Sequence, residues 1–201
     1  MNLDLIAGRH VPRETLDRLR RYETLVRQEN DCQNLVGKST LADFLVRHVA
    51  DSLQLLRSIP VGFSLCDIGS GAGLPGVVIA AMGDNAVTLV EPRRLRAEFL
   101  RRVVSELELE SAVVEAKAAN ARGIFDVITA RAVAPLADIL AFTQHLSHAE
   151  TIWVLPKGRR VDSELEVLHR SWQCDVGEVS SVTDPDARII TLRHVQPKVG
   201  R

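Results

Sequence analysis

The chain has few cysteines, few aromatic side chains and almost no net charge. Its three cysteines form no CxxC pair and no metal-ligand spacing, so neither a disulfide framework nor a metal site is predicted. A net charge of −1 gives no overall attraction to a polyanion, so local basic patches would have to bind a nucleic-acid partner. The first residues contain no long apolar run, so the sequence predicts neither a signal peptide nor a membrane anchor there. We therefore expect a cytoplasmic monomer with no bound metal and no membrane partner.

Apolar residues make up 46% of the 201, which is enough for one packed domain with a modest extension. Helical periodicity predicts two helices before the main domain, over residues 12–28 and about 40–58. The second of these should bury Leu41, Leu45, Val49, Leu53 and Leu56. From residue 63 onward, short apolar strands alternate with amphipathic helices, which is typical of a mainly parallel sheet covered on both faces.

Two strand-like runs close the chain, at 176–182 and 188–195, and the turn residues between them indicate a hairpin. The predicted fold class is therefore α/β and Rossmann-like, with a seven-stranded, mainly parallel sheet, helices on both faces and an N-terminal helical extension. The predicted division is an extension at 1–60, an α/β domain at 61–195 and a short basic tail at 196–201.

A glycine-rich turn follows the first strand of the α/β domain. Glycine lets the backbone turn tightly and approach a ligand closely, and open α/β sheets bind ligands at this edge. Gly71, Gly73 and Gly76 also match the dinucleotide fingerprint, so the glycines alone do not identify the cofactor. Asp67 ends the strand, and the alternate glycines from Gly69 follow it at once. This pattern favours S-adenosylmethionine, with Asp67 bonding the amino-acid part of the cofactor directly or through water.

Glu91 ends the second strand, where an acid can accept hydrogen bonds from ribose hydroxyls. That requirement is shared with NAD enzymes, so it supports the class of cofactor without choosing within it. The alternative interpretation is a structural turn with a solvated acid at a strand end. Hydride transfer is disfavoured, because the single tyrosine, Tyr22, precedes the loop and has no lysine four residues later.

The segment after the fourth strand lacks the Asn/Asp-Pro-Pro-aromatic sequence typical of methyltransferases that act on the amino groups of bases. It runs from Thr129 to Pro135 through Arg131, and no cysteine lies near it to serve as a nucleophile. Guanine N7 already carries a lone pair and has no proton to remove. Its methylation needs alignment with the methyl donor and no base. The absence of that sequence and of a nearby cysteine is therefore consistent with guanine N7 as the acceptor.

From about residue 34 to about residue 195 the sequence resembles the small-subunit (16S) ribosomal RNA guanine-N7 methyltransferase family (RsmG, also called GidB). The pieces that carry the resemblance are Asn34-Leu35, Arg47-His48-x-x-Asp51-Ser52, Asp67-Ile68-Gly69-Ser70-Gly71-Ala72-Gly73-Leu74-Pro75-Gly76, Thr129-Ala130-Arg131-Ala132 and Leu155-Pro156-Lys157-Gly158.

The resemblance implies S-adenosylmethionine as the cofactor and small-subunit ribosomal RNA, or a ribosomal particle, as the partner. It places cofactor contacts on Gly69, Leu74, Ala118, Ala119 and Arg131. Relatives often have an acid in the Ala118–Ala119 pair, so contact here would use the backbone. With the loop and the two acids, the predicted cofactor-binding residues are Asp67, Gly69, Gly71, Gly73, Leu74, Glu91, Ala118, Ala119 and Arg131.

Arg131 is the strongest candidate for an active-site side chain, because it follows the fourth strand where the methyl acceptor should lie. It could bind the cofactor, stack on a base or pair with a phosphate. The alternative is a structural ion pair with an acid such as Asp67 or Glu91. His48 is the second candidate catalytic residue, with a role in shaping the site and not as a general base.

The alternative for the segment around His48 is purely structural. Arg47 and Asp51 lie four residues apart, as do His48 and Ser52, so an ion pair and a hydrogen bond along one helix would explain them.

The predicted RNA-binding residues are Arg47, Lys157, Arg159 and Arg160. Lys157 to Arg160 follow the fifth strand and should lie nearest the ligand-binding edge. Other basic runs, at 93–102 and in the first helix, are more typical of solvated helix faces. We therefore predict a methyltransferase acting on guanine N7 in small-subunit ribosomal RNA. The alternatives are a small-molecule methyltransferase and a non-catalytic nucleotide- or RNA-binding module of the same fold.

Overall fold

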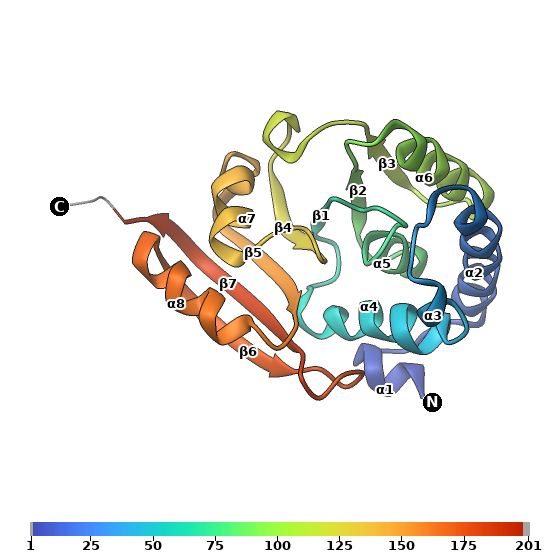
Figure 1. Ribbon diagram of the computed structural model, residues 1–201, viewed down its shortest axis with the longest axis horizontal. Helices are drawn as coiled ribbons and strands as arrows, with labels where there is room; N and C mark the ends of the chain where they lie inside the picture. The colour runs from blue at the N-terminus through green and yellow to red at the C-terminus, as the bar shows by residue number, and fades with distance from the viewer. Residues whose placement is uncertain (1, 199–201) are drawn as a thin grey trace.

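The computed structural model describes residues 2–198, which contain a seven-stranded sheet flanked by helices (Figure 1). The strand order is β3-β2-β1-β4-β5-β7-β6, and β7 is antiparallel to both of its neighbours, while the other pairs are parallel. The strands are Ser64–Ile68 (β1), Ala86–Val90 (β2), Ser111–Val114 (β3), Phe125–Ala130 (β4), Ser147–Lys157 (β5), Trp172–Ser180 (β6) and Arg188–Pro197 (β7). The predicted fold class is confirmed.

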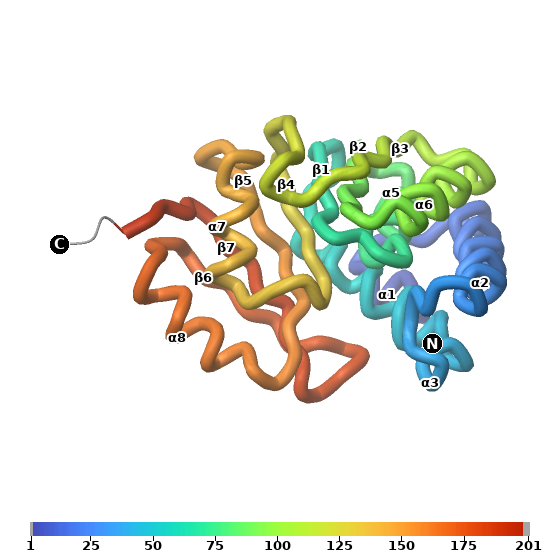
Figure 2. Tube along the Cα trace, turned by 45° about the horizontal axis from the view of Figure 1, so that its top comes forward, coloured from blue at the N-terminus to red at the C-terminus, as the bar shows by residue number. Residues whose placement is uncertain are grey.

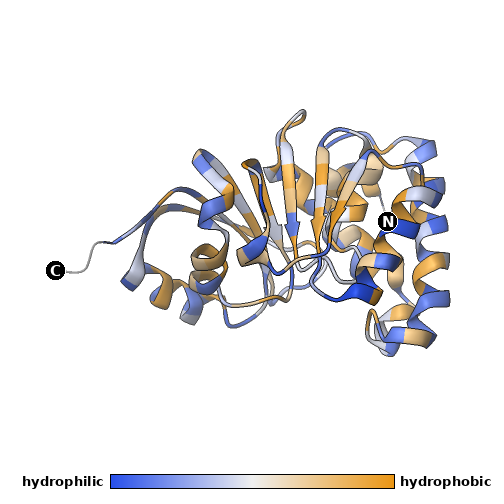
Figure 3. Cartoon of the chain, turned by 90° about the horizontal axis from the view of Figure 1, so that it is seen from above, coloured by the Kyte–Doolittle hydropathy of each residue, from blue (hydrophilic) through white to orange (hydrophobic). Residues whose placement is uncertain are grey.

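Two groups of helices cover the sheet, and each has its own hydrophobic cluster. The larger cluster includes residues of α5 (Gly76–Met82), α6 (Arg94–Glu106) and the segment before β1. The smaller cluster includes residues of α7 (Leu136–Thr143) and α8 (Val161–Ser171). Short 3₁₀ helices at Ala118–Asn120 (η3) and Gln144–Leu146 (η4) complete this side. Figure 3 shows apolar residues gathered on the strands and on the helix faces toward them.

The segment before β1 is helical, as expected, and packs into the larger cluster. Its elements are Leu3–Ala7 (α1), Arg13–Gln33 (α2), Lys38–Leu41 (α3), a π-helix at Leu45–Ala50 (η1), Asp51–Leu53 (α4) and a 3₁₀ helix at Gln54–Ser58 (η2). Figure 2 shows these helices at one end of the molecule, with α8 and the β6–β7 hairpin at the other. No helix within residues 2–198 is both long and apolar enough to cross a bilayer.

The predicted continuous helix over 40–58 is wrong, because the chain changes its helical type several times in that stretch. A π-helix inserts extra chain into the helical repeat and so shifts which residues face inward. Phe44, which the regular pattern left out, is fully buried, while Leu41 and Leu45 are only partly buried. The Phe44 ring lies 5.3 Å from the His48 ring, centroid to centroid.

The predicted ends of several elements differ from the observed ones. Helix α2 continues five residues past the expected end and stops where Asn34 adopts a left-handed conformation, with φ of 46°. Strand β7 runs to Pro197, past the predicted domain boundary at 195, because it pairs with the first residues of β6. Residues 199–201 of the predicted tail lie outside the described residues.

Candidate active site

The glycine loop between β1 and α5 requires glycine for two physical reasons. Gly69, Gly71 and Gly73 have φ of 65°, 57° and 102°, a region that side chains strain. A Cβ on Gly69 would also lie 2.7 Å from Cγ2 of Val133, in the segment after β4. Gly76 begins α5 tightly against β1, where a Cβ would lie 2.7 Å from Oδ2 of Asp67. The loop therefore approaches both the segment after β4 and the end of β1.

Asp67 is fully buried at the end of β1, where both of its carboxylate oxygens accept hydrogen bonds from the protein. The Thr129 hydroxyl on β4 donates to Oδ1 at 2.8 Å, and the Gly76 N–H donates to Oδ2 at 3.2 Å. Burial raises the pKa of Asp67 to about 6 despite these donors. The carboxylate thus joins β1, β4 and the start of α5. A hydrogen bond to a cofactor would be a further one, beside those from Thr129 and Gly76.

Glu91 holds the glycine loop from the end of β2. Its side chain is buried, and Oε2 accepts a hydrogen bond from the Gly71 N–H at 2.9 Å while Oε1 accepts one from the Arg93 N–H at 2.9 Å. Each carboxylate oxygen has a second lone pair, so the same group can also accept a ribose hydroxyl. Its role as a ribose acceptor stays a prediction.

Tyr22 of α2 reaches the glycine loop, a contact that the sequence analysis missed. Its hydroxyl donates a hydrogen bond to the Ala72 carbonyl at 2.8 Å, and its ring packs edge-on against Phe44 at 5.5 Å between centroids. Burial raises the pKa of this hydroxyl well above its usual range. The N-terminal helices therefore help to shape the loop. No local signal in the sequence pairs Tyr22 with Ala72.

The other predicted cofactor-binding residues lie at the same edge of the sheet. Leu74 is buried in the larger hydrophobic cluster. The pair Ala118 and Ala119 lies in η3, just after β3, with Ala118 half-buried and Ala119 exposed. Alanine side chains offer no polar group, so a contact here would still use the backbone. These assignments stay predictions.

Arg131 forms an ion pair with an acid, as the alternative interpretation held, but the acid is Asp51 and not one of its two examples, Asp67 and Glu91. Its Nη1 lies 3.3 Å from Oδ2 of Asp51, and each side chain is 20% exposed. The same guanidinium donates to Nδ1 of His48, at 3.3 Å from Nη1. The expected Arg47–Asp51 pair is not among the ion pairs of residues 2–198. The Ser52 hydroxyl bonds to the backbone carbonyl of His48, not to its ring.

His48 is neutral in this arrangement. Burial, with Arg131 as the second cause, lowers its pKa to about 4. Because Arg131 can only donate, Nδ1 of His48 is an acceptor and the ring proton is on Nε2, which lies 2.9 Å from the Thr40 hydroxyl. Both ring nitrogens are therefore engaged, and His48 is not poised to act as a general base.

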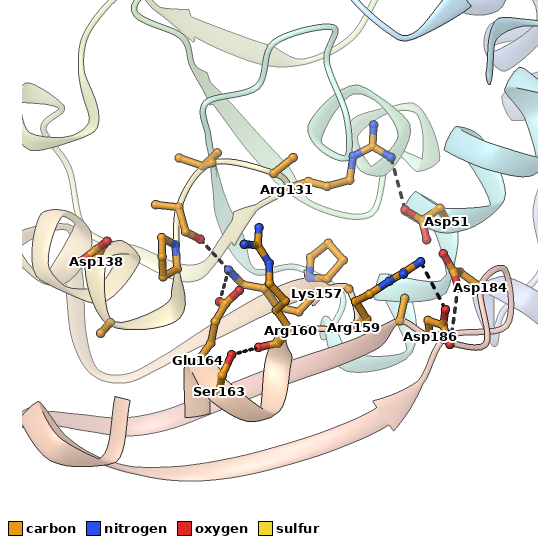
Figure 4. Close-up of a pocket in the computed structure, with 18 of the residues that line it drawn as sticks. Asp51, Arg131, Asp138, Lys157, Arg159, Arg160, Ser163, Glu164, Asp184 and Asp186 are labelled. Carbon is orange, nitrogen blue, oxygen red and sulfur yellow. Dashed lines mark hydrogen bonds and ion pairs between the residues drawn. The ribbon is translucent and has the colours of Figure 1, made fainter. Parts of the chain in front are cut away.

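A pocket of about 1100 Å³ opens beside Arg131, between the segment after β4, the end of β5, the start of α8 and the β6–β7 turn (Figure 4). It brings together all four predicted RNA-binding residues: Arg47, Lys157, Arg159 and Arg160. Figure 4 shows Arg131 reaching toward Asp51 and Arg159 toward the turn, where it lies 3.6 Å from Asp186. Val133 lines the pocket and also lies against Gly69, so the pocket adjoins the glycine loop.

Lys157 is more buried than the other predicted RNA-binding residues, and its ammonium is bound within the protein. It donates to the Ala134 carbonyl at 2.6 Å and pairs with Glu164 at 2.9 Å, and its side chain is 9% exposed. Two of the three N–H donors of this ammonium are thus used, which leaves one for a contact with RNA. Lys157 therefore ties β5 and α8 to the segment after β4, and its RNA contact stays a prediction.

Basic residues on α6 and α2 are largely paired with acids on the surface. Arg94 pairs with Glu98, Arg101 with Glu115, and Arg102 with Glu29. Such pairs cancel the local positive field, as expected for solvated helix faces.

The cysteine nearest the glycine loop is Cys66, one residue before Asp67. Cys66 is buried in β1, where burial raises the pKa of its thiol to about 12, so it carries no reactive thiolate. Among residues 2–198, no three His, Cys, Asp or Glu side chains are grouped so that they could hold a metal ion.

Comparison with known sequences gives a family match over most of the chain. The profile described as "GidB: rRNA small subunit methyltransferase G" matches residues 15–192. The chain belongs to this family. A protein of Rhizorhabdus wittichii named ribosomal RNA small subunit methyltransferase G is 42% identical over 96% of this chain and 91% of its own. One of Zymomonas mobilis with the same name is 38% identical over 94% and 90%.

Solved structures with the same fold are distant in sequence. A ribosomal protein L11 methylase from Lactobacillus delbrueckii superposes with a TM-score of 0.61 at 14% identity, covering 74% of this chain and 78% of its own. A TehB-like SAM-dependent methyltransferase from Corynebacterium glutamicum gives 0.59 at 16%, covering 84% and 98%. This GidB-family chain therefore shares its fold with these two proteins, although their sequences differ widely.

Proposed function

We propose that the protein transfers the methyl group of S-adenosylmethionine to N7 of a guanine in 16S ribosomal RNA of the small subunit. Membership of the GidB family supports ribosomal RNA as the substrate. A ribosomal substrate in turn implies a cytoplasmic location, and the prediction of a monomer stays open to a measurement of mass in solution.

The observation that carries the proposal is the position of the arginine-lined pocket beside the glycine loop. The segment after β4 forms one wall of the pocket and, through Val133, also contacts Gly69 of the loop. A methyl donor held by the loop and a nucleotide held in the pocket would thus meet across one short segment. Arg47, Arg159 and Arg160 suit the phosphates that flank the base.

The residues of the loop fit S-adenosylmethionine. Left-handed glycines leave backbone free of Cβ atoms, and Glu91 offers a buried acceptor at the end of β2. When bound, the cofactor supplies an electrophilic methyl group on sulfur. Gly69, Gly71, Gly73 and the two acids Asp67 and Glu91 would hold it.

The protein's own contribution to the reaction is positioning, because guanine N7 has a free lone pair and needs no deprotonation. Arg131 lies at the junction of the loop and the pocket, where it can orient the base or a phosphate. His48 supports the Arg131 guanidinium through its neutral Nδ1 and has no role as a base.

Labelled methyl transfer to ribosomal RNA, followed by borohydride reduction and aniline cleavage, tests this function. We expect cleavage at one guanine of the small-subunit RNA, using naked RNA, precursor particles and mature subunits as parallel substrates. Label on a metabolite but not on RNA would favour a small-molecule methyltransferase. Cofactor binding without turnover on any ribosomal substrate would favour a non-catalytic binding module.

A further inference from the structure

The turn between β6 and β7 is tied to Asp51 by a set of partly buried hydrogen bonds, although more than 120 residues separate them in the chain. The Thr183 hydroxyl donates to Oδ1 of Asp51 at 2.8 Å. Gln54, which is 2% exposed, donates to the same oxygen at 2.8 Å. Asp51 uses its other oxygen, Oδ2, for Arg131.

Gln54 connects the helical segment to the turn through both the nitrogen and the oxygen of its side-chain amide. Its Nε2 donates to the Ser181 hydroxyl at 3.0 Å and approaches the Thr183 hydroxyl at 3.3 Å, while its Oε1 accepts from the Val182 N–H at 2.9 Å. The Ser181 and Thr183 hydroxyls also bond to each other at 2.9 Å. Since Thr183 has one hydroxyl proton and donates it to Asp51, Ser181 donates and Thr183 accepts in that pair.

These bonds fix the direction of a carboxylate that holds a partly buried arginine. A guanidinium has several donor directions, and a carboxylate can rotate unless its other oxygen is held. Thr183 and Gln54 both hold Oδ1, which leaves Oδ2 pointing at Arg131. The turn also forms a wall of the pocket, through Thr183, Asp184 and Asp186.

We propose that Thr183 and Gln54 are positioning residues that aim Arg131 into the pocket by fixing Asp51. This inference rests on the proposed function for its kinetic consequence, because Arg131 is the side chain expected to act on the substrate. The β6–β7 turn is then part of the acceptor site, and not only the end of a hairpin.

The test compares Thr183→Val, which keeps the shape but removes the donor, with Thr183→Ser, which restores the hydroxyl. Thr15→Val is the matched control, because Thr15 also donates one side-chain hydrogen bond within the protein, to the Ala81 carbonyl at 3.1 Å, outside the set of bonds around Asp51. We expect Thr183→Val to lower kcat/KM on ribosomal RNA about tenfold with unchanged affinity for S-adenosylmethionine. Thr183→Ser should recover most of the rate, and Thr15→Val should keep it.

A readout that needs no substrate separates this inference from the proposed function. In protein labelled with ¹⁵N-arginine, the guanidinium N–H signals of Arg131, assigned with Arg131→Lys, should broaden in Thr183→Val but not in Thr15→Val. If wild-type protein fails to methylate RNA but these signals change, the proposed function fails and the positioning role stands. Unchanged signals, a kcat/KM equal to that of Thr15→Val, or a parallel loss of cofactor affinity would overturn the positioning role.

Discussion

At the scale of single residues, the site is defined by how buried charges are compensated. Arg131 carries a permanent positive charge with only 20% of its side chain exposed, and Asp51 supplies the opposite charge. A second cation beside it would be unfavourable, so the adjacent His48 is kept neutral by its burial and by the arginine itself. Neutrality makes Nδ1 available as an acceptor for the guanidinium.

Replacing Arg131 by glutamine should raise the pKa of His48 from about 4, measured by NMR titration of the ring signals. The pKa should stay below 6.5, because burial is the larger cause and remains in the variant. Arg47→Gln is the matched control and should give a smaller rise, since Arg47 is the weaker of the two cations acting on His48. Equal rises in the two variants would show that Arg131 does not lie against the ring.

Asp67→Asn should change how stability depends on pH. The native pKa of Asp67 is about 6, above the ordinary 3.8, so between pH 4 and 6 the folded protein binds more protons at this site than the unfolded chain. Wild-type stability therefore falls through this window as pH rises, by about 3 kcal/mol from this group. Asparagine can accept from the Gly76 N–H through its oxygen and donate to the Thr129 hydroxyl through its NH2. It does not titrate, so it removes this fall.

The measurement is urea denaturation of both proteins at several pH values, taken as a difference. His48 acts with the opposite sign, because its lowered pKa costs stability as pH falls below 6.5. Since both proteins contain His48, its contribution cancels in the difference. Relative to wild type, Asp67→Asn should gain stability from pH 4 to 6 and show a constant difference above it. Parallel profiles would contradict a raised pKa.

At the scale of elements, the N-terminal helices act on both halves of the site. Helix α2 contacts the glycine loop through Tyr22, and Phe44 packs between Tyr22 and His48. Residues of η1 and α4 then hold Arg131. One packed series of side chains thus joins the proposed cofactor loop to the proposed acceptor pocket.

Tyr22→Phe should destabilise the protein by about 1–2 kcal/mol and weaken the binding of S-adenosylmethionine, because it leaves the buried Ala72 carbonyl without its donor. Urea denaturation and calorimetry measure the two effects. Thr24→Val on the same helix removes an exposed hydrogen bond to the Arg20 carbonyl and should change neither quantity by much. Cofactor affinity equal to wild type in Tyr22→Phe would show that α2 does not shape the loop.

The sequence predicted the elements that repeat a simple pattern. Alternating strands and helices predicted the sheet, and the glycines with Asp67 and Glu91 correctly located the loop and the two strand ends beside it; that both acids are buried was not predicted. The π-helix at Leu45–Ala50 was missed, because a regular period assumes no inserted turn. The partner of Arg131 was also missed, since Asp51, Gln54 and Thr183 meet only after the hairpin folds back onto the helical segment.

At the scale of the whole molecule, charge is neutral overall but uneven in detail. Helix faces outside the site hold paired arginines, as with Arg94 and Glu98. The pocket holds Arg47 and Arg160, which have no ion pair within residues 2–198. The division into an extension at 1–60 and a methyltransferase domain at 61–195 stays a prediction, although both parts contribute to the larger hydrophobic cluster.

The double variant Arg47→Ala, Arg160→Ala should bind ribosomal RNA more weakly, with a salt dependence reduced by about 1–2 in the slope of log K against log salt. Filter binding at several salt concentrations measures it. The matched control is Arg94→Ala, Arg101→Ala, which removes two arginines already paired with Glu98 and Glu115. An equal loss of slope in the control would assign RNA binding to α6 instead of the pocket.

The most direct test of the central claim is mass spectrometry of small-subunit ribosomal RNA from a strain that lacks this protein. We predict that one 7-methylguanine disappears, that wild-type protein restores it, and that a stable Arg131→Ala variant does not. An unchanged content of 7-methylguanine in the deletion strain would contradict the proposed function.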